Sequence, residues 1–190
     1  NNYLMRKESF PFDLLYWNSD STRMPATMHS FYLRNFYLGN KLREPGGIEL
    51  GGAKIDISKV KTPCYFVSAI EDHIAPWKST YMGALLPTGP VKFVLGGSGH
   101  IAGIINPPVA NKYGFWTNAE MPASSDDFLA GATQNPGSWW TDWQQWVTDH
   151  AGGKEKIDAR KPGDGPLKAI EDAPGSFVKL RLDKKKVAAK

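Results

Sequence analysis

The chain has 190 residues, 41% of them hydrophobic, which suffices for one sizeable core and excludes a collagen-like, disulfide-rich or disordered polypeptide. No run approaches the roughly 18 uncharged apolar residues of a membrane helix, so we expect no membrane span. The net charge of +4 comes from residues 151–190, with 11 basic against 6 acidic residues, whereas residues 1–150 hold 12 and 13, so we expect no nucleic-acid-binding surface on the folded part.

Residues 1–50 are crowded with aromatic side chains, and we expect them to form a helical segment associated with a cap or lid. Pro25 suits the first position of a helix, and Gly39 and Asn40 end it. The apolar and aromatic residues between them follow a helical spacing: Met28, Phe31, Tyr32 and Phe36. So many rings predict burial on more than one side, either in an ordinary core or as a cap or partner surface over an active site.

Residues 51–153 show a strand, helix, strand pattern typical of an α/β core. The run 63–69 predicts a strand buried on both faces, residues 77–86 a helix, and residues 91–95 a second strand. Such a unit makes the two strands parallel and brings both of their polar ends to one edge of the sheet.

Two further helices are predicted by capping residues. Ser124, with Asp127 three positions later, forms a capping box, and Ser138 caps a helix that Gly152 and Gly153 end. An apolar stripe runs along this last helix: Trp139, Trp143, Trp146 and Val147. We interpret the stripe as packing on the sheet rather than as a carbohydrate platform. Residues 154–190 form a basic tail, which we expect to be solvated.

One acid and one histidine stand where a catalytic pair is expected. Asp72 follows the first strand and His100 follows the second, so parallel pairing places both at the carboxyl edge, where ligands bind in open sheets. This order matches the last two members of an α/β-hydrolase triad, in which histidine is the general base and the carboxylate orients it. Glu71 competes with Asp72 for the acid role, and the spacing leaves that choice open.

No residue of the chain is placed to be the nucleophile. Cys64 opens its strand and lies eight residues before Asp72, which at about 3.3 Å per residue puts it at the opposite edge of the sheet. We therefore expect Cys64 to be a buried core thiol. Ser98 lies in a glycine-rich stretch without the G-x-S-x-G spacing of a nucleophile elbow, so we interpret the stretch as a tight turn that lets His100 project.

Metal and nucleotide sites are not expected. The four histidines and Cys64 show neither His-x-x-x-His nor Cys-x-x-Cys spacing. Gly97-x-Gly99-x-x-Ala102 fits a loose dinucleotide fingerprint, but Pro107 and Pro108 would break the helix that has to follow.

Four segments resemble class I polyhydroxyalkanoate synthases. They are Pro11–Asn18 (PFDLLYWN), Glu71–Trp77 (EDHIAPW), Gly99–Pro108 (GHIAGIINPP) and Gly137–Trp143 (GSWWTDW). The resemblance extends from Asn1 to about Val178. It implies the C-terminal portion of an enzyme that polymerises (R)-3-hydroxyacyl-CoA, of the 3-hydroxybutyryl type, into polyester with release of coenzyme A.

The resemblance also implies the site. The family's catalytic acid falls on Asp72 and its base on His100, whereas its nucleophilic cysteine, in a G-x-C-x-G elbow, has no counterpart here. The fold implied is α/β, a partial α/β-hydrolase fold with the last strands and helices of the core and part of the cap, and we expect the chain alone to be inactive. Whether Asp72 only orients His100 or also activates the substrate hydroxyl stays open.

For partners and location, the resemblance implies a cytoplasmic homodimer on polyester granules, in contact with the growing polyester and with granule-associated proteins. No cofactor is implied, because the CoA thioester is a substrate. Two alternatives remain: the C-terminal part of a serine α/β-hydrolase, a lipase or depolymerase, and a non-catalytic granule or dimerisation module.

Overall fold

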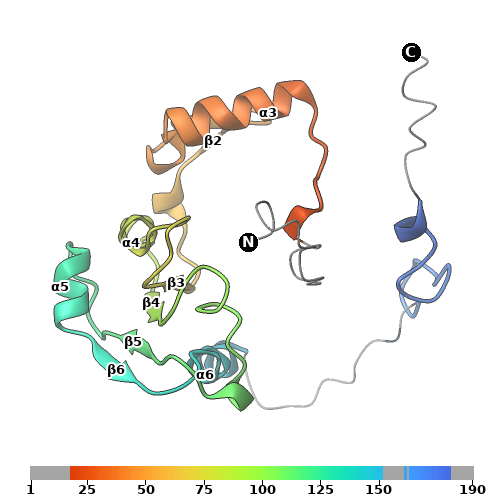
Figure 1. Cartoon of the computed structure of the whole chain (residues 1–190). Coiled ribbons are helices and arrows are strands. Elements are labelled where there is room, and N and C mark those ends of the chain that lie inside the picture. The colour runs from red at the N-terminus through yellow and green to blue at the C-terminus, as the bar shows by residue number, and fades with distance from the viewer. Residues whose placement is uncertain (1–17, 152–160, 162, 181–190) are drawn as a thin grey trace, which may run out of the picture. The chain divides into compact units, whose positions relative to one another are not determined.

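The structure is a computed structural model that describes residues 18–151, 161 and 163–180. The chain divides into two compact units, Asn1–Trp146 and Val147–Lys190. The first unit contains every strand of the described residues (Figure 1). In the second, the one further element described is a short 3-10 helix, η5 (Phe177–Lys179). The lysine-rich stretch of the predicted basic tail lies outside the described residues.

A four-stranded mixed sheet forms the centre of the first unit, with the strand order β3-β4-β5-β6. β3 (Cys64–Ala69) and β4 (Val91–Gly96) are parallel and pair along their whole length, from Cys64 opposite Val91 to Ala69 opposite Gly96. β5 (Phe115–Thr117) and β6 (Thr133–Asn135) follow, each antiparallel to its neighbour. The helix α4 (Trp77–Ala84) connects the two parallel strands. The predicted strand, helix, strand unit is therefore confirmed, with a helix two residues shorter than expected.

The prediction that the first strand is buried on both faces is wrong. Only Ser68 and Ala69 of β3 are buried, whereas β4 is buried from Phe93 to Gly96. The reason is position, because β3 is the outermost strand of the described sheet and β4 lies between two others.

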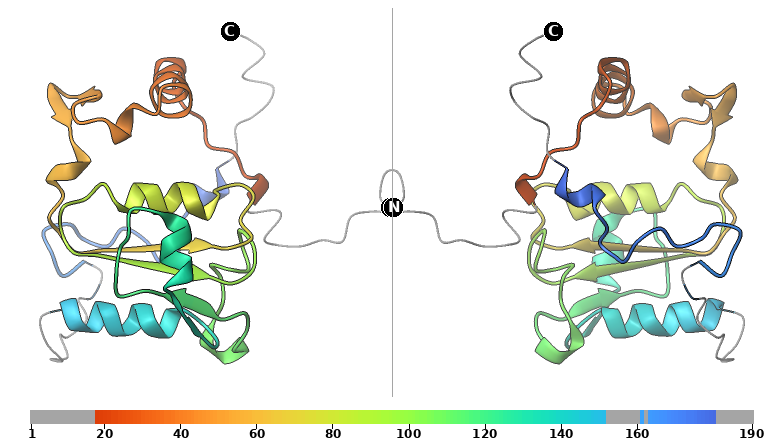
Figure 2. Two further views of the ribbon diagram at one scale, coloured as in Figure 1. Left: turned by 90° about the vertical axis from the view of Figure 1, so that its left-hand side faces the viewer. Right: turned by 90° about the vertical axis from the view of Figure 1, so that its right-hand side faces the viewer.

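The two faces of the sheet bury separate clusters of side chains, since successive residues of a strand point to opposite faces. Phe93 and Leu95 of β4 pack with residues of α4 and with Phe128 of α5 (Ser125–Ala130). Val94, between them in sequence, packs on the other face with Phe115 and Trp139. Figure 2 shows α4 and α6 (Trp140–His150) on opposite sides of the strands.

Both predicted helix caps are present. The Ser124 side chain accepts hydrogen bonds from the backbone N–H groups of Asp126 and Asp127, at 3.2 and 3.4 Å. At the start of α6 the Ser138 hydroxyl accepts one from the N–H of Trp140 at 3.1 Å. The helix ends at His150, and Gly152, its predicted end, lies outside the described residues.

A polar contact joins α6 to the two parallel strands. Asp142 accepts a hydrogen bond from the Tyr65 hydroxyl at 2.8 Å and forms an ion pair with Lys92 at 2.7 Å. Burial, followed by the bond to Asp142, raises the pKa of Tyr65, so its hydroxyl keeps its proton and donates. Of the predicted tryptophan stripe, Trp139 is buried against the sheet but Trp143 is 43% exposed. The stripe therefore packs on the sheet through Trp139 and through Trp146, whose ring centroid lies 5.5 Å from that of Tyr65 in β3.

The predicted aromatic helix is confirmed, although its second half is wider than an α-helix. It consists of α3 (Ala26–Tyr32) followed directly by a π-helical stretch, η1 (Leu33–Leu38). Neither element has a buried residue, so of the two predicted settings the ordinary core is not found among the described residues. Its rings instead contact one another, as Tyr32 does with Phe36 and Tyr37 at centroid distances of 5.0 and 5.3 Å. Phe36 is half-buried, whereas Tyr32 and Tyr37 are 40% and 72% exposed.

Short elements link this helix to the sheet. η2 (Lys41–Arg43) precedes a hairpin of β1 (Ile48–Leu50) and β2 (Ala53–Ile55), and η3 (Ile57–Lys59) follows it. Gly51 and Gly52 form the turn of the hairpin with φ values of 56° and 79°, which side chains disfavour. A last 3-10 turn, η4 (Pro108–Ala110), precedes β5. In the described part of the chain, no helix has the length and apolar character required to cross a membrane.

We expect Asp142→Ala to destabilise the first unit by about 1 to 3 kcal/mol, because it leaves the partly buried Tyr65 hydroxyl and Lys92 ammonium without their acceptor. Urea unfolding followed by tryptophan fluorescence measures this. The matched control is Asp126→Ala, which removes an ion pair with Lys78 whose side chains are 71% and 57% exposed. Exposed pairs contribute about 1 kcal/mol or less. Equal losses in the two variants would contradict the anchoring role of Asp142.

Candidate active site

Asp72 is fixed by a tight turn directly after β3. Its backbone N–H donates to the carbonyl of Ala69, the last residue of the strand, at 3.1 Å. Its side-chain oxygen Oδ1 accepts hydrogen bonds from the backbone N–H groups of Ile74 and Ala75, both at 2.9 Å. Aspartate favours such turns because its short side chain reaches backbone N–H groups two and three residues ahead. The position of this carboxylate is therefore set within the seven residues from Ala69 to Ala75.

His100 lies at the equivalent place after β4, in a turn rich in glycine. Ser98 adopts a φ of 69°, which reverses the chain ahead of the histidine. A β-carbon on Gly97 would lie 3.0 Å from both the Gly114 carbonyl oxygen and the Tyr113 β-carbon, so the turn packs closely against the start of β5. The prediction of a tight glycine turn that presents His100 agrees with this geometry.

The hydrogen bonding of the parallel strands continues into both turns. The Ile70 N–H donates to the Gly96 carbonyl at 2.9 Å, and the Glu71 N–H donates to the Ser98 carbonyl at 3.0 Å. These two bonds prevent the turns from moving apart beyond the end of the sheet.

The two side chains meet at this edge. His100 Nδ1 lies 2.8 Å from Asp72 Oδ2. The Asp72 side chain is only 6% exposed, whereas that of His100 is 43% exposed. An ionised carboxylate can only accept, so Nδ1 carries the proton and Nε2 is left to exchange a proton with another group. An acid held in place and a reachable imidazole together form an acid–base pair.

The surroundings of Asp72 keep it charged. Burial alone would raise its pKa, but the Ala75 N–H, the bond to His100, the Ile74 N–H and the charge of His100 together lower the pKa below its ordinary value. Both carboxylate oxygens are therefore stabilised by donors.

The competing residues lie elsewhere. Glu71 is exposed, and only its backbone contributes at the site, through the bond to Ser98. Cys64 pairs with Val91 at the first residue of β3, the opposite end of the strand from Ala69. The prediction of a fully buried thiol is wrong, because Cys64 is only half-buried at the sheet's outer strand, where its thiol donates to the Thr62 carbonyl at 3.2 Å.

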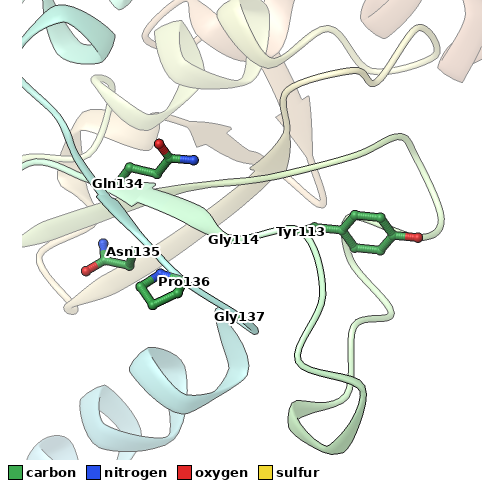
Figure 3. Close-up of a pocket in the computed structure, with 6 residues that line it drawn as sticks. All are labelled: Tyr113, Gly114, Gln134, Asn135, Pro136 and Gly137. Carbon is green, nitrogen blue, oxygen red and sulfur yellow. The ribbon is translucent and has the colours of Figure 1, made fainter.

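A shallow pocket that the sequence did not predict lies next to the histidine turn, with a volume of about 380 Å³ (Figure 3). Its lining residues are Tyr113, Gly114, Gln134, Asn135, Pro136 and Gly137. The Gly97 N–H donates to the Gly114 carbonyl at 2.9 Å, which places the pocket at the same edge of the sheet as His100. Gly114 and Gly137 both have a positive φ. Glycine marks turns in a sequence, so these two residues are the signal that could have predicted this concave region.

The glycine fingerprint at residues 97–102 leads into a single helical turn rather than a long helix. Gly103 N–H donates to the Gly99 carbonyl and Ile105 N–H to the Ile101 carbonyl, both at 2.8 Å. The next regular element is the 3-10 helix η4, which starts at Pro108. Within residues 18–151, 161 and 163–180, no three His, Cys, Asp or Glu side chains are grouped to hold a metal ion.

Comparisons with known proteins point to one family, although no protein-family model matches the chain. The poly(3-hydroxyalkanoate) polymerase subunit PhaC of Rhizobium meliloti (strain 1021) is 50% identical over 181 residues, covering 95% of this chain and 29% of the relative. The subunit PhaC of Cupriavidus necator is 44% identical, with 95% and 31% covered. The poly(3-hydroxyalkanoate) polymerase of Methylorubrum extorquens is 47% identical over 182 residues, with 95% and 30% covered.

The structure defines a class, a mixed α/β protein with an aspartate–histidine pair at the ends of neighbouring parallel strands. Within that class, the chain is similar over 95% of its length to poly(3-hydroxyalkanoate) polymerases, and the resemblance found in its sequence is confirmed. It spans about 30% of the length of the curated relatives that it matches, which is consistent with the predicted partial portion.

The lowered pKa of Asp72 makes its contribution to stability depend on pH. A carboxyl whose pKa is lower in the folded state stabilises the fold above its unfolded pKa, about 3.9, and this contribution disappears as the pH falls through the folded value. We expect Asp72→Asn to be less stable than the wild type by about 1 to 3 kcal/mol at pH 7. The difference should shrink below about pH 4.

Urea unfolding of both proteins between pH 7 and pH 2 measures this difference. Asp126→Asn serves as control, because the exposed Asp126 should cause a much smaller difference at every pH. A stability difference for Asp72→Asn that stays constant down to pH 2 would show that the carboxylate charge contributes nothing to the fold.

Proposed function

We propose that this chain supplies the acid and the base of a Cys-His-Asp triad in a polymerase that joins (R)-3-hydroxyacyl-CoA units, of the 3-hydroxybutyryl type, into polyester. The single observation that supports this most is the 2.8 Å contact between His100 Nδ1 and Asp72 Oδ2 at the carboxyl edge of two parallel strands. The names of the relatives supply the reaction class. A cysteine outside this chain is the proposed nucleophile.

In the proposed reaction, His100 Nε2 takes the proton of the cysteine thiol, and the thiolate attacks the thioester carbonyl. The tetrahedral intermediate collapses, its bond to the sulfur of coenzyme A breaks, and the leaving thiolate takes the proton back from the imidazolium. The acyl group is now bound to the cysteine, and the 3-hydroxyl of another unit attacks it in the same way. Throughout, the Asp72 carboxylate holds the imidazole in place and stabilises its charged form.

The fold proposed for the complete enzyme is that of the α/β-hydrolases. β3 is the outermost strand of the described sheet, and its free edge offers backbone groups to a further parallel strand. Next to it, a largely apolar hollow of about 850 Å³ is lined in part by Phe66 of β3 and by Met82 and Leu86 at α4. Both features suit additional core elements placed beside β3.

Polymerisation also requires a dry site, because water would otherwise hydrolyse the acyl-enzyme. The two turns that carry the pair expose apolar side chains, with Ile74 at 64%, Ile101 at 45% and Ile105 at 60% exposure. We propose that a cap covers them. The largely exposed aromatic helix of α3 and η1 is a candidate for that cap or for a contact between the two subunits of a homodimer on polyester granules.

We expect His100→Gln and Asp72→Asn to lower the rate of coenzyme A release by about 10²- to 10⁴-fold, the usual contribution of a general base. The assay uses 3-hydroxybutyryl-CoA and the polymerase that contains this chain together with its nucleophile. His73→Gln is the matched control, because His73 is an exposed neighbour of Asp72 outside the pair. A retained rate in His100→Gln, with the fold intact by circular dichroism, would refute the proposed role of His100.

The 190-residue chain alone should release no coenzyme A above the uncatalysed rate, because Cys64 lies at the end of β3 opposite to the acid–base pair. The same thioester assay on the purified chain tests this. Activity that disappears in Cys64→Ala would contradict the proposal of an external nucleophile.

A further inference from the structure

We infer that the start of α6 positions the catalytic histidine by holding the turn that carries it. The catalytic meaning of this inference rests on the proposed function. Three consecutive residues each donate a side-chain hydrogen bond to a backbone carbonyl of the turn after His100. The bonds are Ser138 Oγ to Asn106, Trp139 Nε1 to Gly103 at 3.0 Å, and Trp140 Nε1 to Ile104 at 2.9 Å. We call Ser138, Trp139 and Trp140 the clamp.

Most of the clamp is buried. Ser138 is 4%, Asn106 3% and Trp139 9% exposed. A buried indole N–H or hydroxyl needs a protein partner, and here each partner is a carbonyl of the histidine turn. Asn106 extends the clamp, since its side-chain amide donates to the Lys112 carbonyl at 2.8 Å. The bonds of the clamp therefore specify one conformation of the turn.

Gly103 locks the turn onto the end of the sheet. A β-carbon at Gly103 would lie 2.6 Å from the β-carbon of Ala69 and 2.7 Å from the Gly97 carbonyl oxygen, so no other residue fits without displacement. His100 thus sits between two fixed points, the Ser98 carbonyl bound to Glu71 and the Gly103 carbonyl bound to Trp139.

The two members of the pair are therefore held in different ways. The Asp72 carboxylate is oriented by backbone N–H groups of its own turn. The His100 turn has one helical turn of its own, and the side-chain hydrogen bonds that its carbonyls accept come from the start of α6, far along the chain. Removing the clamp should loosen His100 and leave Asp72 in place.

Trp139→Phe and Trp140→Phe remove one N–H donor each and keep an aromatic ring. The matched control is Trp143→Phe, one turn further along the same helix, where the half-exposed indole contacts the Trp139 ring but lies outside the clamp. Nuclear magnetic resonance of the 190-residue chain follows the imidazole Nδ1 proton of His100, shifted downfield by its carboxylate bond and assigned by its loss in His100→Gln. Circular dichroism checks the fold.

We expect the solvent exchange of this proton to accelerate about tenfold in Trp140→Phe, as the loss of one hydrogen bond implies, and to stay within about twofold in Trp143→Phe. In the polymerase that contains this chain, kcat should fall by a similar factor in Trp140→Phe at an unchanged KM. Trp140→His, which restores a ring N–H, should recover part of the loss.

An unchanged Nδ1 proton signal and exchange rate in folded Trp140→Phe and Ser138→Ala would overturn the inference. Trp139 also belongs to the core, so Trp139→Phe could fail to fold. In that case the test uses Trp140→Phe and Ser138→Ala. The resonance readout needs no catalysis. If the exchange rates are as expected but the wild-type enzyme releases no coenzyme A, the proposed function is refuted. The inference that the clamp positions His100 then still holds.

Discussion

The parallel pairing of β3 and β4 is the constraint on which the site depends. It runs in register from Cys64 and Val91 to Ala69 and Gly96, and it continues for two more backbone bonds into the turns. An offset of two residues between the strands would shift the turn of one by more than 6 Å, at about 3.3 Å of rise per residue, and would separate the carboxylate from the imidazole. The backbone register of the two strands therefore sets the distance between the side chains of Asp72 and His100.

The central strand β4 can hold that register because both of its faces are covered. Phe93 and Leu95 pack with α4 and α5, whereas Val94 packs with Trp139. Because both faces are covered, most side chains of β4 are apolar. Charged groups reach solvent at the ends of the strands. The same packing brings the start of α6 beneath the histidine turn, so the core and the support of the site share Trp139.

The sequence predicted the central part of this arrangement because its signals are local. Each of these signals lies within a few residues, and each feature is present in the structure. They are the apolar runs of the two strands, the break between helix and strand, and the capping serines Ser124 and Ser138. Asp72 and His100 were placed at one edge by topology alone. Spacing could not choose between Asp72 and Glu71, because that choice depends on which side chain turns back to accept from Ile74 and Ala75.

The predictions that failed depend on what lies beside an element. The aromatic spacing of the first helix is compatible with burial, yet no residue of α3 or η1 is buried among the described residues, and β3 is half-exposed because no described strand adjoins its outer side. The clamp was missed for a similar reason. Trp139 was interpreted by its apolar surface, whereas the indole N–H groups of Trp139 and Trp140 find partners 36 residues earlier in the chain.

The exposure of the pair is unequal, and this inequality follows from what acid–base chemistry requires of each member. A buried carboxylate costs free energy unless donors surround it, and Asp72 has two backbone N–H groups and the imidazole. A general base must reach another molecule or segment, so in its proposed role His100 has to stay accessible, and its 43% exposed ring is not fixed by burial. Its turn is fixed instead, from the side facing α6. Rigid support beneath an exposed imidazole reconciles a precise position of His100 with access to the proposed nucleophile.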